Sequence, residues 1–128
     1  MKKLLIFIAV IVALALFLND FLRSGKMENF FDSHPKPAFD SKIEYGVAFL
    51  ADLANHKKSA EKRYKRIMEK YPDEYIAPYA WVDLIELYEE NGDKDSELPL
   101  AKEFIEKYPN HEKTALIERK ISIIEHGI

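Results

Sequence analysis

The chain has 128 residues, of which 48% are hydrophobic and 32% are charged. This length allows one modest domain with a single core and is too short for two. The sequence contains no cysteine, which excludes disulfides, thiolate metal sites, a cysteine nucleophile and a lipid-modified cysteine. The formal net charge is −3, and because residues 1–22 carry two lysines against one aspartate, the remainder carries −4. That balance does not fit a general nucleic-acid-binding protein.

The N-terminal segment is the most apolar part of the sequence. Two lysines precede a run of apolar residues from Leu4 to Leu18. At 1.5 Å per residue this run spans roughly 22 Å, and two further apolar residues beyond Asp20 extend it toward the ~30 Å of a bilayer core. We therefore expect residues 1–23 to form an uncleaved signal anchor, that is, a single transmembrane helix.

A cleaved signal peptide is the alternative interpretation of the same segment. Its one small-x-small triplet, Ala13-Leu14-Ala15, lies inside the apolar run, so cleavage there would leave an apolar new N-terminus. The leading lysines predict a cytoplasmic N-terminus with the rest of the chain across the membrane. In a bacterium this gives a single-pass inner-membrane protein whose C-terminal domain is periplasmic.

The remainder of the sequence divides into a linker and a helical domain. Residues 24–41 contain a glycine and two prolines without a sustained period, which predicts an irregular linker. Residues 42–128 have helical periodicity throughout and no strand pattern, so the predicted fold class is all-α. About five helices are expected, within residues 40–55, 57–71, 77–92, 96–108 and 110–127.

Each predicted helix has features that orient it. The first has Asp40 or Ser41 as a candidate N-cap, and the fourth has Ser96, with Pro99 then in the first turn. Gly92 is expected to end the third helix. Apolar stripes are expected to face the core. They comprise Ile43, Val47, Leu50 and Ala54; Ala60, Tyr64, Ile67, Met68 and Tyr71; Trp81, Leu84, Ile85 and Tyr88; and Ala115, Leu116, Ile117, Ile121 and Ile124.

One four-residue word occurs twice. Glu-Lys-Tyr-Pro occupies residues 69–72 and 106–109, a spacing of 37 residues. Because proline cannot continue a helix, Pro72 and Pro109 are predicted to end two helices, with the preceding tyrosines packed beneath each turn. The repeated word therefore indicates a repeated helical hairpin rather than a catalytic loop.

The residues around this word resemble the tetratricopeptide-repeat family, a helix-turn-helix repeat of about 34 residues. Trp81, Leu84 and Tyr88 match the W-x2-L-G-x2-Y start, Ala60 and Tyr64 match the A-x3-F middle, and Pro72 and Pro109 match the closing proline. The sequence departs from the family pattern at four positions. Ile85 stands where the family has glycine, and Glu44 where it has tryptophan. Glu97 stands where the family has alanine, and Ala101 where it has a large aromatic residue. The link "DEYIAPYA" is similar to variant repeats of bacterial envelope proteins, such as outer-membrane assembly lipoproteins and the periplasmic Tol-Pal coordinator.

The sequence offers no pattern typical of an active site. His34, His56, His111 and His126 are scattered without an i, i+4 partner, which favours solvated turn histidines over metal ligands. The segment "NGDKDSE" at 91–97 only partly resembles a calcium loop, because it lacks the central glycine and the closing glutamate. No phosphate-binding glycine loop or hydrolase motif occurs. We therefore expect neither catalysis nor a cofactor.

Charge is distributed unevenly along the helices. Residues 57–70 carry a net +5 and residues 83–97 a net −6. The two segments are predicted neighbours, so they either complement each other or leave a basic face for anionic lipid or an acidic partner. That basic face comprises Lys58, Lys62, Arg63, Lys65 and Arg66.

The resemblance implies a membrane-anchored adaptor that binds another protein of the cell envelope. A secreted, soluble helical-repeat domain and an accessory subunit of an envelope complex are the alternatives. Two repeats are fewer than the three that such arrays usually need, so self-association or a partner is expected to complete the stack. The concave face of such a stack is built from the first helix of each hairpin. The partner-binding residues expected there are Tyr45, Phe49, Asp52, Tyr79, Asp83 and Glu86.

Overall fold

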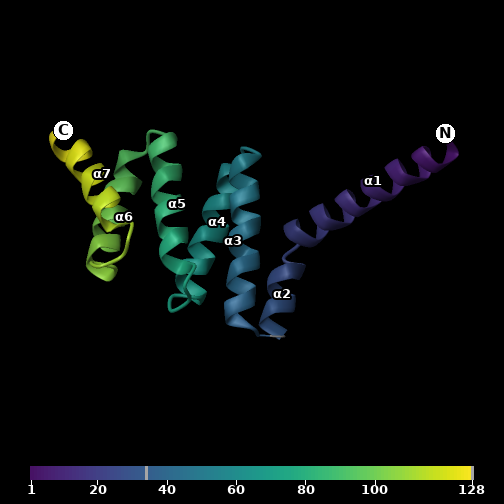
Figure 1. The fold of residues 1–128 in the computed structure, drawn as a ribbon, viewed down its shortest axis with the longest axis horizontal. Helices are drawn as coiled ribbons and strands as arrows, with labels where there is room; N and C mark the ends of the chain where they lie inside the picture. Colours follow the sequence, from purple (N-terminus) through teal and green to yellow (C-terminus); the bar gives the residue numbers. More distant parts are fainter. Residues whose placement is uncertain (34, 128) are drawn as a thin grey trace. The chain divides into compact units, whose positions relative to one another are not determined.

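The computed structural model describes residues 1–33 and 35–127, and in this part of the chain all regular structure is α-helical (Figure 1). The helices are α1 (Lys2–Arg23), α2 (Lys26–Ser33), α3 (Pro37–Leu53), α4 (Lys57–Lys70), α5 (Ala77–Glu90), α6 (Lys94–Lys107) and α7 (Thr114–His126). The predicted all-α class is confirmed. The helix count exceeds the expected five: α1 corresponds to the separately expected N-terminal helix, and α2 is an additional helix within the expected linker.

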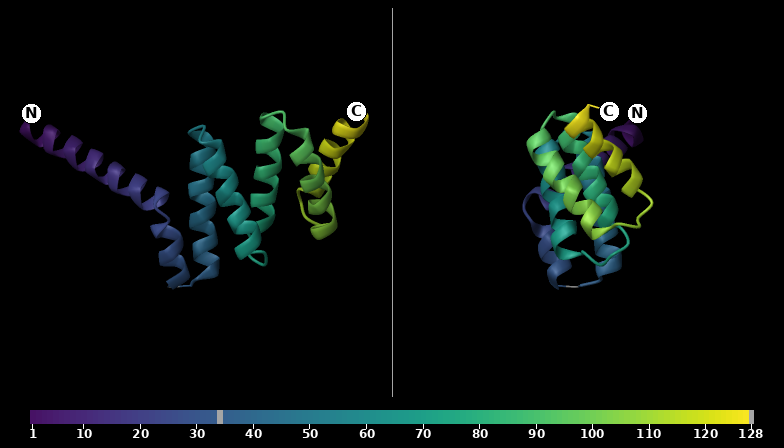
Figure 2. Two further views of the ribbon diagram at one scale, coloured as in Figure 1. Left: turned by 180° about the vertical axis from the view of Figure 1, so that it is seen from behind. Right: turned by 90° about the vertical axis from the view of Figure 1, so that its left-hand side faces the viewer.

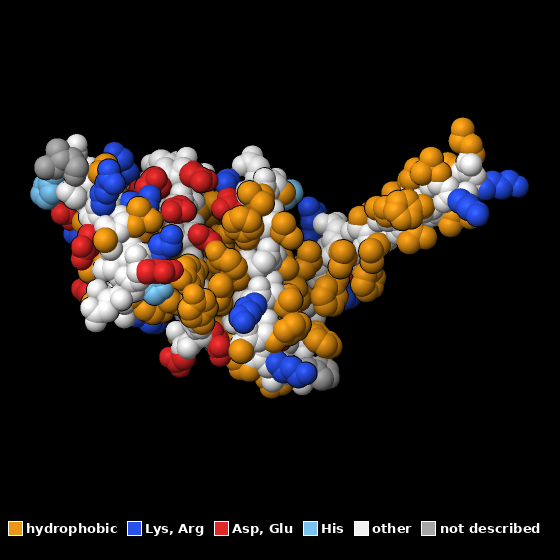
Figure 3. Space-filling view, viewed as in Figure 1, with side chains coloured by type: hydrophobic (Ala, Val, Ile, Leu, Met, Phe, Trp, Pro, Cys, Tyr) orange, Lys and Arg blue, Asp and Glu red, His pale blue; other side chains and the backbone are white. Residues whose placement is uncertain are grey.

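By its internal contacts the chain forms two compact units, Met1–Lys36 and Pro37–Ile128. In the first unit, α1 has 22 residues, and none of them is buried. It is the one helix among the described residues that is long and apolar enough to cross a membrane, a property that signal sequences share. Its large apolar side chains are exposed, and many of them are seen on the face drawn in Figure 3.

The segment expected to be an irregular linker contains the short helix α2. Gly25 has a positive φ of 79°, a conformation that glycine adopts without steric cost, and this residue separates α1 from α2. Lys26 Nζ lies 2.9 Å from Asp20 Oδ2 across the bend, in an exposed ion pair. The prediction failed here because a helix of eight residues is too short for its periodicity to be visible.

In the second unit, consecutive helices run antiparallel and lie in a row from α3 to α7 (Figures 1 and 2). Two groups of buried side chains hold this row together, and α5 contributes to both. The first comprises Ala48, Ala60, Tyr64, Ile67, Ala77, Ala80, Leu84, Leu87 and Tyr88. The second comprises Trp81, Val82, Ile85, Ala101, Phe104 and Ile117.

The two Glu-Lys-Tyr-Pro words end two helices in the same way. Tyr71 follows the last residue of α4 with φ −124° and ψ 48°, and Tyr108 follows the last residue of α6 with φ −127° and ψ 63°. In each case the tyrosine N–H still donates to the carbonyl four residues earlier. Proline disfavours the helical conformation for the residue before it, which explains why both helices end here. The predicted helix ends are confirmed.

The apolar stripe of α3 was predicted to face the core, and this prediction was wrong. Ile43, Leu50 and Ala54 are exposed, whereas the buried face of the helix includes Glu44 and Ala48. Burial of Glu44 turns the apolar stripe away from α4. The stripes of α4 and α5 are buried or half-buried as predicted, whereas in α7 the predicted Ala115 and Leu116 are exposed.

Two predicted helix starts also need correction. Helix α3 begins at Pro37, so Asp40 and Ser41 lie inside it and are buried. Helix α6 is capped by Asp93, whose carboxylate accepts the Ser96 N–H at 3.1 Å. With α6 beginning at Lys94, Pro99 lies inside the helix rather than in its first turn.

Candidate protein-binding groove

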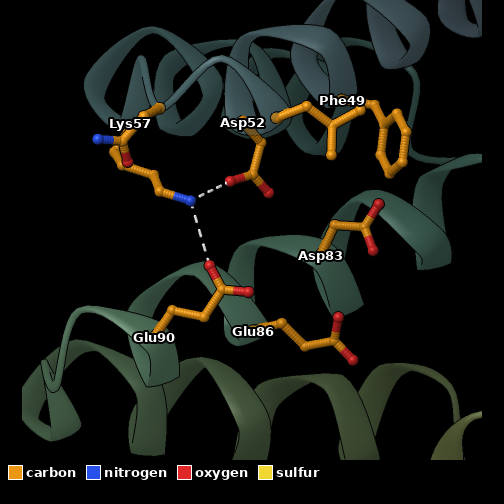
Figure 4. Close-up of a pocket in the computed structure, with 8 residues that line it drawn as sticks. Phe49, Asp52, Lys57, Asp83, Glu86 and Glu90 are labelled. Carbon is orange, nitrogen blue, oxygen red and sulfur yellow. Dashed lines mark hydrogen bonds and ion pairs between the residues drawn. The ribbon is translucent and has the colours of Figure 1, made fainter.

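A groove of about 390 Å³ opens between the C-terminal half of α3, the start of α4 and one face of α5 (Figure 4). We call it the acidic groove. It is lined by Phe49, Asp52, Leu53, Asn55, Lys57, Asp83, Glu86 and Glu90. Residues spaced three or four apart share a helix face, so α5 presents its three carboxylates to the groove from one side.

The groove carries four carboxylates against one ammonium group. Lys57 Nζ donates to Asp52 and, at 3.1 Å, to Glu90, so it links the two walls at one end (Figure 4). The hydrogen bond with Asp52, followed by that with Glu90, raises the pKa of Lys57. Asp83 and Glu86 lie away from this ammonium group (Figure 4). The lining is therefore acidic overall, with its excess negative charge at the Asp83 end.

Asp83 is the most perturbed carboxylate of the groove. Burial raises its pKa to about 6, a hydrogen bond from Tyr45 Oη opposes that rise, and the nearby charges of Glu86 and Asp52 add to it. Burial and the bond to Asp83 also raise the pKa of Tyr45. A cation placed beside Asp83 would relieve this repulsion, so the geometry favours a positively charged ligand.

The rim of the groove is apolar. Phe49 is 46% exposed and Leu53 is 69% exposed, although both are large hydrophobic side chains. An aromatic ring beside a set of carboxylates is suited to a segment that combines a cationic group with an apolar one.

The structure brings together five of the six residues predicted to bind a partner. Phe49, Asp52, Asp83 and Glu86 line the groove, and Tyr45 donates a hydrogen bond to Asp83. Tyr79 lies elsewhere, in a group of rings and carboxylates. It donates to Glu112, its hydroxyl lies 3.3 Å from that of Tyr75, and its ring packs edge-on against His111.

Four lining residues were not predicted. Leu53 and Glu90 continue the faces of α3 and α5 by one turn, so extending the predicted set by four residues would have found both. Asn55 lies in the connection between α3 and α4 and has a positive φ of 65°, and Lys57 is the first residue of α4. Helical periodicity does not extend to such a turn, and no sequence signal pointed to them.

The residues of the predicted basic face of α4 are only partly exposed to solvent. Arg63 is buried, with Nη1 3.6 Å from Glu44 Oε2, and Arg66 Nε lies 3.1 Å from Glu44 Oε1. Lys65 lies 2.8 Å from Glu61 Oε1, one turn earlier in α4. All three lysines of the set, Lys58, Lys62 and Lys65, are exposed, and Lys65 makes its ion pair at the surface. Much of the positive charge of α4 is therefore balanced within the unit.

Two departures from the repeat pattern are buried carboxylates. Glu44 has no exposed surface and sits where the pattern has tryptophan. Glu97 is also buried, and burial, together with the neighbouring Glu89, raises its pKa. Lys120 of α7 lies 2.8 Å from Glu89 Oε2. These carboxylates belong to the packing between helices and do not open into the groove.

The histidines are dispersed in the structure, as in the sequence. His56 precedes α4, His111 Nδ1 accepts a hydrogen bond from the Lys113 N–H, and His126 lies in the last turn of α7. His34 lies outside the described residues. Among residues 1–33 and 35–127, no cluster of three or more histidine or carboxylate side chains is arranged to hold a metal ion.

Comparison with known proteins adds no assignment. No protein-family model matches the chain, and no curated protein matches it significantly.

Proposed function

We propose that this protein is a non-enzymatic adaptor of the bacterial cell envelope, which α1 anchors in the inner membrane and whose acidic groove binds a protein partner. The groove itself carries the proposal, since it combines four carboxylates with exposed Phe49 and Leu53 between two helices. The antiparallel row of α3–α7 and the 37-residue recurrence of identical helix ends support a tetratricopeptide-like stack.

The partner segment should carry a lysine or arginine next to an apolar residue. A cationic group near Asp83 and Glu86 would reduce the repulsion between these carboxylates, while an apolar side chain would cover Phe49. Lys57 already pairs with Asp52 and Glu90, so the Asp83 end of the groove is the expected position of the cation.

Photocrosslinking in native membranes tests the groove. A photoreactive phenylalanine analogue at position 49 of the full chain is expected to capture a protein, which mass spectrometry would identify. Glu86→Lys should reduce this adduct at least tenfold, because it places a positive charge beside the expected cation. The matched control is Glu103→Lys, which makes the same charge change at an exposed site on α6 and should leave the adduct unchanged. Equal loss in both variants, or no adduct at position 49, would count against the proposal.

The anchored state has its own test, because α1 also has the properties of a signal sequence. We expect the chain to stay with the membrane after alkaline carbonate washing, and intact mass to show the residues of α1 retained. A mature chain lacking α1 would instead support the alternative, a secreted domain. Protease added to spheroplasts should digest residues 24–127 if they face the periplasm.

A further inference from the structure

The apolar face of α3 consists of Phe39, Ile43, Gly46, Leu50 and Leu53. All five residues are exposed, and Phe39, Leu50 and Leu53 have exposed fractions of 60%, 64% and 69%. Hydrophobic side chains gather over α3 in the space-filling view (Figure 3). Exposure of this many large apolar side chains on one helix marks an interaction surface rather than isolated surface residues.

The spacing of these residues is that of a helix–helix contact. They follow one another at intervals of four, three, four and three residues, which places them on a single stripe of the helix. Lys42 is the one charged residue within that arc. The carboxylates of α3 lie on other faces: Asp40 and Glu44 are buried, and Asp52 lines the groove. A partner for this stripe therefore needs an apolar surface rather than a charged one.

Gly46 lies at the centre of the stripe. It has ordinary helical backbone geometry, and a Cβ added to it would meet no atom within 4 Å. Glycine at such an exposed helical position is less favourable than alanine, and no close neighbour within the described chain requires it. A glycine here does allow a second helix to approach closely. A lipid surface would gain nothing from it, so the glycine favours a helix as the occupant.

From this arrangement we propose that the apolar face of α3 docks against the same face of a second copy of the chain, with the two α3 helices antiparallel. The stripe is nearly symmetric about Gly46, with apolar residues seven positions before and after it. A twofold axis at Gly46 then sets Phe39 against Leu53 of the other copy and Ile43 beside its Leu50. An isologous contact requires this self-complementarity. The two Lys42 side chains lie on opposite sides of the axis and do not oppose each other.

The surface available is adequate for a stable contact. With roughly 200 Å² for a fully exposed side chain of this size, the exposed fractions of the four large residues give about 450 Å² per copy. Both copies together bury about 900 Å² from these residues, and the flanking polar residues bring the total near the ~1,000 Å² expected of a specific interface. Leu53 also lines the acidic groove, so the contact adjoins the groove at this end, while its other four residues lie outside the groove lining.

Cysteine crosslinking in membranes tests the geometry directly, because the chain has no cysteine of its own. Disulfides form where Cα atoms lie about 4.4–6.8 Å apart. A mixture of Phe39→Cys and Leu53→Cys chains should yield a crosslinked dimer under mild oxidation, whereas either variant alone should yield little. Gly46→Cys should crosslink to itself, while the control Glu103→Cys should not. Dimers from Phe39→Cys alone, or equal crosslinking at position 103, would overturn the antiparallel contact.

A second variant separates docking from folding. Gly46→Leu introduces a better helix former at an open position, so it should leave the monomer folded and at least as resistant to urea. The same change should weaken dimerisation at least tenfold, measured by fluorescence transfer between labelled full chains in lipid vesicles. Unchanged dimerisation would overturn the proposal. So would quenching of a probe at position 50 by lipid-borne quenchers, or an intrachain crosslink from residue 50 to residue 30, since each would identify a different occupant.

Discussion

Glu44 is a carboxylate with no exposed surface, held between Arg63 and Arg66 of the following helix. In such a buried pair the cost of removing both charges from water offsets much of their attraction, whereas loss of one partner leaves that cost uncompensated. We expect Glu44→Ala to lower the free energy of unfolding by about 3 kcal/mol, since the buried Arg63 and the half-buried Arg66 then both lose their ion pair with this carboxylate. Urea unfolding of the full chain in detergent, followed by circular dichroism, measures this.

The control for Glu44 is Glu103→Ala, at an exposed position of α6, which should change the free energy of unfolding by less than about 0.5 kcal/mol. A second comparison uses Glu44→Leu combined with Arg63→Met. Because the two most buried charges are then removed and only the more exposed Arg66 remains, this double variant should recover much of the loss. If it proved as unstable as Glu44→Ala, loss of the ion pair between Glu44 and Arg63 would not be the cause.

Asp83 provides a prediction that depends on pH. Its pKa in the folded protein, about 6, is above the ordinary 3.8, so the folded state binds this proton more tightly than the unfolded state. The resulting stability is present below pH 4 and is lost as the pH rises through 6. Asp83→Asn, which keeps an acceptor for Tyr45, should therefore be more stable than the parent by about 1 kcal/mol at pH 7.5, a value reduced for partial exposure.

At pH 3 the difference between Asp83→Asn and the parent should be small, because the parent carboxyl is then largely protonated in both states. Urea unfolding at the two pH values measures the change. Glu103→Gln removes one negative charge at an exposed site and is the matched control. An equal pH-dependent gain in that variant would show that overall charge, and not Asp83, is responsible.

At the level of single elements, the start of α6 allows a test of which side chain is the N-cap of the helix. Asp93 accepts the Ser96 N–H at 3.1 Å, whereas the sequence had suggested Ser96 itself as the cap. Asp93→Ala should lower the free energy of unfolding by about 1 kcal/mol, as expected for loss of an N-cap. Ser96→Ala should have a much smaller effect. The reverse order in thermal or urea unfolding would contradict the assigned start of α6.

The elements also show what the sequence could predict. Helices α4 and α5 were predicted well because their apolar residues recur at helical spacing and a Tyr-Pro pair ends α4. In α3 the same reasoning chose the wrong face, because it assumed that apolar residues turn inward, whereas Glu44 is buried with its two arginines. Only the contact of Glu44 with the arginines of α4 in the folded structure shows which face of α3 is buried.

The acidic groove was predictable to a similar extent. Five of the six expected residues meet there, because positions three or four apart on α3 and α5 necessarily share a face. Tyr79 is also on α5, but it bonds to Glu112, which lies 33 residues further along the chain. Asn55 comes from a turn with no periodicity, and Lys57 is the first residue of α4, directly after that turn. Long-range partners and turn geometry are therefore what the sequence pattern could not supply.

At the scale of the whole second unit, α5 joins the two groups of buried side chains. Leu84 packs in the first group and Ile85, its neighbour in the chain, packs in the second. Leu84→Ala and Ile85→Ala should each lower the free energy of unfolding by about 3 kcal/mol. If α5 couples the groups, both variants should reduce amide hydrogen-exchange protection in α4 and in α6 alike. Loss confined to one side of α5 would show that the two groups unfold separately.

The matched backbone at Tyr71 and Tyr108 makes these two positions equivalent junctions. A segment cut after one tyrosine and joined after the other meets the same φ and ψ angles within about 15°. Residues 72–108 can therefore be copied in tandem, and each copy brings a turn, one helix like α5 and one like α6. We expect a chain with this segment duplicated to fold with correspondingly higher molar ellipticity at 222 nm; an unchanged signal would contradict this. Duplication of this segment would lengthen the protein by two helices and leave the existing contacts between neighbouring helices unchanged.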